Sequence, residues 1–143
     1  MRSLFTPIAA MPVSPSPLVI VHLAAALCAM VLGAVQLWRA KGTPGHRLLG
    51  WSWVVLMFTV AITSLWIPAF LHFTWIHVFT LLVLIALPRA LIKIRRGDVA
   101  GHARTMRSLY AGGLVIAGVF TLIPGRLLGN LLWSHVWGYL PPT

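Results

Sequence analysis

The amino-acid sequence predicts an all-α integral membrane protein: a four-helix bundle made of two similar helical hairpins, followed by a C-terminal interfacial helix. Of its 143 residues, 59% are hydrophobic and only 8% are charged, whereas an ordinary soluble domain carries about 25% charged residues. The charged residues also lie in the gaps between long uncharged runs. A chain this short cannot bury so much apolar surface in a core of its own, so we expect lipid to be its solvent.

The first uncharged run covers residues 3–38, and its part from Leu18 to Leu37 is long enough to cross about 30 Å of hydrocarbon as a helix. Only Arg2 is basic before this run, so we interpret it as a retained helix and not as a cleaved signal peptide. Residues 1–17 are expected to form an extended tail because prolines interrupt them at four positions: Pro7, Pro12, Pro15 and Pro17.

The second uncharged run, residues 48–88, leaves room for two helices, which we place at 46–67 and 71–87 with a break at Pro68. The basic segment 89–107 extends the third helix and then turns. A fourth helix follows over 106–123. The transmembrane domain therefore covers residues 18–126. Residues 127–143 form the interfacial segment, because aromatic rings of the kind found there favour the headgroup level: Trp133, Trp137 and Tyr139.

The orientation follows from the distribution of the cations. Nine of the eleven Lys and Arg residues lie in the first and third loops, which share a side if there are four spans. The positive-inside rule puts these loops in the cytoplasm and both termini in the periplasm. We therefore expect a multi-pass protein of the bacterial inner membrane. The net charge of +10 is thus a topology signal, and we expect no nucleic-acid partner. The nine cations are Arg39, Lys41, Arg47, Arg89, Lys93, Arg95, Arg96, Arg104 and Arg107.

The two basic loops resemble each other. Lys41-Gly42 is followed by Gly45-His46, and Arg96-Gly97 is followed by Gly101-His102. A histidine also precedes each loop: His22 lies 24 positions before His46, and His77 lies 25 positions before His102. The pattern favours two hairpins in the same orientation, although short Gly-rich basic turns also resemble each other by chance.

Four of the six histidines are candidate ligands. In an up-and-down bundle, helices one and three are diagonal, as are helices two and four. His22 would then face His77 across the core near the periplasmic side, and we call these two the outer pair. His46 would face His102 near the cytoplasmic side, and we call these two the inner pair. Two imidazoles on each iron are the ligands of low-spin b-type haem, so the sequence predicts one or two haem b groups. The cations that could pair with haem propionates are Arg47, Arg104 and Arg107 at the cytoplasmic side and Arg126 at the periplasmic side.

Other interpretations stay open. Small residues such as Gly33 and Gly113 would leave room for a flat haem, but ordinary transmembrane packing uses them too. The inner histidines also suit interfacial caps, and the outer ones suit hydrogen bonds. A copper or zinc site is an alternative, formed by His22, His72 and His77. The only acid, Asp98, excludes hydrolysis by a carboxylate pair.

The chain resembles a bacterial family of predicted four-helix membrane proteins of unknown function, over about Pro17 to Arg126. The resemblance implies the fold and not an activity. The chain departs from the family pattern at Ala103. The family is expected to have Arg directly after His, whereas here Ala103 separates His102 from Arg104. A looser likeness to di-haem cytochrome b proteins concerns the histidine layout alone. The matching residues are His22, Gly33, Gln36, Lys41-Gly42, His46-Arg47, Gly50, Gly97-Asp98, His102, Met106, Tyr110 and Arg126.

Two functions of different classes follow. The first is a membrane electron-transfer protein, a redox carrier or a component of a quinone-linked oxidoreductase, that holds b-type haem through the paired histidines. The second is a cofactor-free accessory or structural subunit of a larger membrane complex or homo-oligomer, with its histidines in hydrogen bonds. A small-molecule or metal transporter is a third and weaker hypothesis.

The topology can be tested with reporter fusions. Fusions after Thr43 and after Gly97 should report the cytoplasm because both sites lie in basic loops, and a fusion after Thr143 should report the periplasm. Alkaline phosphatase and green fluorescent protein activities measure the two sides. A cytoplasmic signal at Thr143 would show that the span count is wrong.

Overall fold

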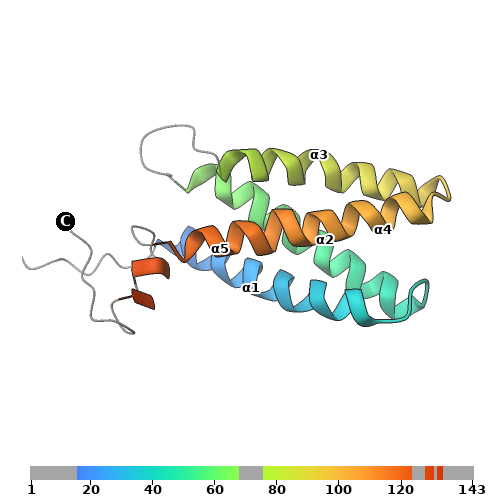
Figure 1. Cartoon of the computed structure of the whole chain (residues 1–143), viewed down its shortest axis with the longest axis horizontal. Helices are drawn as coiled ribbons and strands as arrows, with labels where there is room; N and C mark the ends of the chain where they lie inside the picture. The colour runs from blue at the N-terminus through green and yellow to red at the C-terminus, as the bar shows by residue number, and fades with distance from the viewer. Residues whose placement is uncertain (1–15, 68–75, 124–127, 131, 134–143) are drawn as a thin grey trace, which may run out of the picture.

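The computed structural model describes residues 16–67, 76–123, 128–130 and 132–133, and these contain helices and turns but no strand. Three α-helices form the first three rods of Figure 1. A fourth rod consists of two short α-helices joined end to end by a π-helix, η1. The elements are α1 (Pro17–Trp38), α2 (Pro44–Trp66), α3 (Ile76–Arg95), α4 (Val99–Ser108), η1 (Leu109–Ile116) and α5 (Ala117–Thr121).

Three helices are long and apolar enough to cross a membrane: α1, α2, and α3 from His77. Their outward faces carry exposed aliphatic side chains such as Val31 and Val55, as expected where lipid is the solvent. The fourth rod differs because α4 is polar and the apolar part is short. The structure is thus an all-helical membrane fold with three candidate spans among the described residues.

The two basic turns lie at the same end of the molecule (Figure 1), and they share a backbone device. Gly42 and Gly97 both have positive φ, at 79° and 80°, a region that glycine enters without steric cost. Each turn is followed by a side-chain cap: Thr43 accepts from the His46 N–H at 3.1 Å, and Asp98 accepts from the Gly101 N–H at 2.8 Å. The similarity seen in the sequence therefore has a counterpart in the backbone.

The predicted bounds hold within two residues for α1 and α2, but not for helix four. The sequence places helix three at 71–87 with an extension into the basic segment, and α3 indeed continues through Pro88 to Arg95. Leu87 and Ala90 on either side of the proline are fully buried. Packing on both sides holds the helix together across the missing N–H. Helix four begins at Val99 and not at 106, because Asp98 caps it. Residues 71–75 lie outside the described residues.

Three helical rods pack closely together at Gly33 of α1. Trp53 of α2 donates its indole N–H to the Ala29 carbonyl at 2.9 Å, and Tyr110 of η1 donates its hydroxyl to the Met30 carbonyl at 3.2 Å. A Cβ on Gly33 would lie 2.5 Å from the Tyr110 ring and 2.7 Å from the Trp53 nitrogen. Gly33 therefore serves close helix packing, and two aromatic side chains fill the space beside it.

Helix pairing follows the chain. The main packed pairs are α1 with α2, α2 with α3, and α3 with α4 and η1, and η1 also packs against α1. The largest completely shielded side chains in the core come from three rods: Met57, Leu87 and Leu109. Of the predicted interfacial segment, residues 128–130 and 132–133 are described and are helical. Trp133 there donates to the Leu122 carbonyl at 3.0 Å.

Neighbouring glycines of η1 allow a matched test of packing. A Cβ on Gly113 would lie 2.9 Å from Val83 of α3, whereas a Cβ on Gly112 would meet nothing within 4 Å. Because valine is stiff and buried, Gly113→Leu should lower the free energy of unfolding by about 1–3 kcal/mol. Gly112→Leu raises helix propensity equally but meets no neighbour, so it should not lower the free energy of unfolding. Thermal unfolding in detergent measures both, and equal transitions for the two variants would contradict the packing.

Candidate functional site

The four candidate histidines lie at two levels of the bundle. His46 is in the first turn of α2 and His102 in the first turn of α4, so both lie at the end with the basic turns. His22 and His77 lie near the starts of α1 and α3, at the opposite end. All four are half-buried.

At the end with the basic turns, called the inner end below, His46 and His102 lie in the first turns of α2 and α4, which belong to different hairpins. His102 has its Nδ1 atom 2.9 Å from the Ala90 carbonyl oxygen of α3. A carbonyl only accepts, so Nδ1 carries the proton and the neutral ring presents a lone pair at Nε2. That nitrogen is the one available to a metal.

His46 is held differently. The side-chain amide of Gln36 on α1 donates to the His46 carbonyl at 2.8 Å. Gly50 makes room for that amide, because a Cβ there would lie 3.2 Å from Gln36 Nε2. The Gln36 Oε1 and His46 Nδ1 atoms are buried and have no hydrogen-bond partner among the described residues. Such unpartnered buried atoms are rare in folded proteins and mark a polar site that is incomplete.

At the outer end, His22 Nδ1 lies 2.9 Å from the Thr63 hydroxyl of α2. That hydroxyl donates its only proton to the Thr59 carbonyl at 2.6 Å, so it accepts from His22. The neutral His22 ring therefore also presents its lone pair at Nε2. A second polar contact at this end joins α2 to α3, where the Ser64 and Thr80 hydroxyls lie 2.7 Å apart.

Sequence reasoning missed the partners of these histidines. Thr63 looked like one more polar residue near a helix end, and its role depends on the packing of α1 against α2. Gln36 stood out in the sequence only as part of the family resemblance. Its position near the end of an uncharged run was the one signal that could have marked it.

The other predicted site residues are less informative. Arg47 and Arg104 are exposed, and Arg126, His72 and His135 lie outside the described residues. The pairing of His22 with His77 stays a prediction. Among the residues that the structure describes, no group of three or more His, Cys, Asp or Glu could hold a metal ion. The three-histidine copper or zinc site includes His72 and is therefore not tested.

The fold defines the chain as an all-helical membrane protein with polar histidine sites at both ends. More particularly, it belongs to the family of predicted membrane proteins DUF2306, which has no known function and whose pattern it matches over residues 19–128. No curated protein and no solved structure matches the chain. The family resemblance expected from the sequence is thus confirmed, whereas the looser likeness to di-haem cytochromes finds no support.

The outer contact gives a prediction. Thr63→Val keeps the shape of the side chain but removes the acceptor of His22 Nδ1, so it should destabilise the protein by about 0.5–1.5 kcal/mol. Thr59→Val is the matched control, because the Thr59 hydroxyl bonds only within its own helix, to the Val55 carbonyl. Thermal unfolding in detergent compares the two, and an equal effect of both changes would rule out a special role for the contact.

Proposed function

We propose that the protein is a membrane electron carrier that holds b-type haem through its histidine pairs. The observation that supports this best is at the inner end: His46 and His102 come from different hairpins, and each lies in the first turn of a helix that begins there. A haem with two imidazole ligands needs two histidines on different helices, with room for the haem between them.

The hydrogen bonds of the histidines support the proposal further. An imidazole that binds a metal through one nitrogen generally donates its other N–H to an oxygen, which fixes the tautomer and the ring orientation. His102 already has such a partner in the Ala90 carbonyl, and His22 has one in the Thr63 hydroxyl. The unpartnered Nδ1 of His46 fits a ring whose position changes when the site is filled.

The finer topology belongs to the same proposal. In it, the rod from α4 to α5 is a fourth span, the basic end faces the cytoplasm of a bacterium, and both termini are periplasmic. The inner and outer histidine pairs then lie near opposite surfaces of the membrane. Electrons could pass between them from a quinol at one face to an acceptor at the other.

The residues of the chain would bind and orient the group. His46 and His102 would hold the inner haem, and His22 and His77 the outer one. Haem supplies a one-electron couple, and two imidazoles per iron leave no open position for a substrate, so a carrier is favoured over an oxygenase. Because Arg47 and Arg104 are exposed, the proposal depends on the histidines and not on these expected propionate partners.

A second candidate is favoured by the same hydrogen bonds. If His22 and His102 serve only to tie α1 to α2 and α3 to α4, the protein is a cofactor-free accessory subunit of a larger membrane complex. This alternative predicts a colourless protein whose histidine variants lose stability and nothing else.

The deciding measurement is the absorbance of the protein purified from haem-replete cells. We expect a reducible Soret band, and His46→Ala and His102→Ala should each remove the same spectral component. The double variant should lose no more than either single one, because one missing ligand already empties the site. His72→Ala, which belongs to neither pair, is the control.

The outer pair has its own outcome. His22→Ala and His77→Ala should each remove the other spectral component and leave the first intact. If two variants of one pair affect different components, the pairing is wrong even though haem binds. If the purified protein has no Soret band, the accessory-subunit proposal replaces the carrier.

A further inference from the structure

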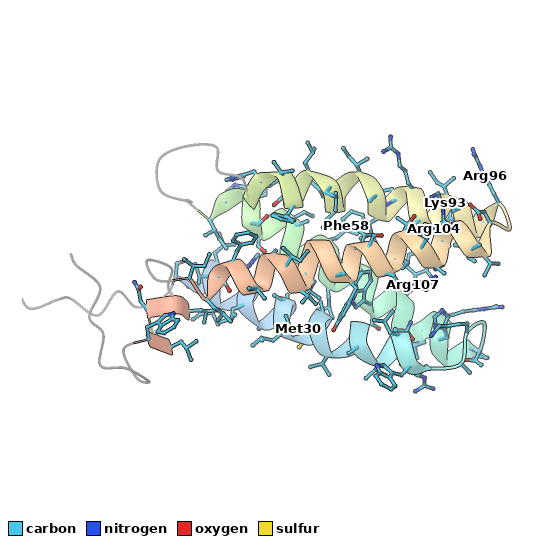
Figure 2. The ribbon with its side chains drawn as sticks, in the orientation of Figure 1. Met30, Phe58, Lys93, Arg96, Arg104 and Arg107 are labelled. Atoms are coloured by element: carbon cyan, nitrogen blue, oxygen red, sulfur yellow. The ribbon has the colours of Figure 1, made fainter. Side chains whose placement is uncertain are left out.

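One face of the fourth rod combines exposed cations with an exposed apolar surface. Arg104, Arg107 and Ser108 are exposed at the α4 end of this rod. Further along the rod, away from the basic end, the exposed residues are apolar: Ala111, Val115 and Val119. Figure 2 shows Arg104 and Arg107 on the same rod, with Arg96 nearer the turn at its end.

The guanidinium groups of this face are free for a ligand. Arg104 makes no hydrogen bond or ion pair with any other described residue, and Arg107 uses only its Nε atom, which donates to the Ala103 carbonyl at 3.2 Å. By contrast, the two lysines of the basic end are engaged: Lys41 caps three carbonyls at the end of α1, and Lys93 donates to Thr105 at 3.1 Å.

No acidic side chain neutralises these arginines. Asp98 is the only acid of the chain, and its carboxylate caps α4 through the Gly101 N–H. The partner that balances the charge must therefore come from outside the chain. In the topology proposed above, on which this inference rests, the fourth rod is a span and this surface lies in the hydrocarbon region, so the partner must also be apolar over the part that faces the valines.

We propose that this face is a binding site for an anionic phospholipid, independently of any haem. Arg104 and Arg107 bind the phosphate, for which the guanidinium fork is well suited. An acyl chain runs along Ala111, Val115 and Val119. The rise from Arg107 to Val119 is roughly 15–18 Å, which is close to the thickness of one leaflet of about 15 Å. The open side of Gly112, where a Cβ would meet nothing, leaves space beside the chain.

The experiment compares two pairs of arginines by native mass spectrometry of the detergent-solubilised full chain. The variant Arg104→Gln/Arg107→Gln removes the proposed headgroup site. The control Arg95→Gln/Arg96→Gln removes the same charge from exposed positions at the end of α3. Each protein is titrated with phosphatidylglycerol and with phosphatidylcholine of identical chains. Thermal unfolding should be unchanged in both variants because all four side chains are exposed.

We expect the wild-type protein to bind phosphatidylglycerol at least fivefold more tightly than phosphatidylcholine. The first variant should lose this preference, and the control should change it less than twofold. Equal losses in the two variants would show that general electrostatic attraction is responsible and would overturn the site. The absence of any preference in the wild-type protein would overturn it as well.

Two further probes separate a lipid from a soluble phosphate. Phosphatidylglycerol with six-carbon chains should bind several-fold more weakly than the long-chain lipid, because it cannot cover the valines. Glycerol phosphate should not compete with the long-chain lipid at equal concentration. If it competes as well as the lipid does, the arginines form a site for free phosphate and the proposal is wrong.

Discussion

The bundle depends on the close approach of two aromatic side chains to the backbone of α1 at Gly33. In hydrocarbon there is no water to satisfy an indole N–H or a phenol, so Trp53 and Tyr110 must find acceptors inside the protein. They find the carbonyls of Ala29 and Met30, one helical turn before the glycine. A side chain at position 33 would cover these carbonyls. Because Gly33 has no Cβ, α1 packs closely against both α2 and η1, and this packing holds the first hairpin against the second.

The histidine sites use the same chemistry at the two ends. His22 and His102 each direct Nδ1 towards an oxygen of a neighbouring helix, and Gln36 holds the backbone of His46. These contacts join helix pairs at the two ends of the bundle, and they leave Nε2 of His22 and His102 with a lone pair. Whether the sites carry haem or only tie helices together, the rings of His22 and His102 are held in defined tautomers. This is the property that a ligand site and a structural clamp have in common.

The sequence predicted the membrane fold and the ends of α1 and α2 well, because hydrophobic length and turn residues are local signals. It predicted that helix three extends into the basic segment, but it did not show what stabilises the helix across Pro88, since the burial of Leu87 and Ala90 comes from other helices. It also missed η1. Leu109 and Leu114 are both buried and lie five positions apart, which is the spacing of a π-helix and not that of an α-helix. The roles of Thr63 and Gln36 as hydrogen-bond partners of histidines could not be predicted for a similar reason: a hydrogen bond between helices depends on how the helices pack.

The π-helix has a consequence for how the fourth rod tolerates changes of length. A π turn contains one residue more than the α turn it replaces, so η1 can lose one residue if one of its π turns becomes an α turn. Deletion of Gly112 should convert part of η1 to α-helix while the rod on either side keeps its rotation, so His102 would keep its bond to Ala90. A deletion at Ser108, outside this reserve, would instead turn all of α4 by about 100°. Comparison of the two deletions by amide exchange in the α3–α4 hairpin would show whether the π-helix accommodates the loss of a residue.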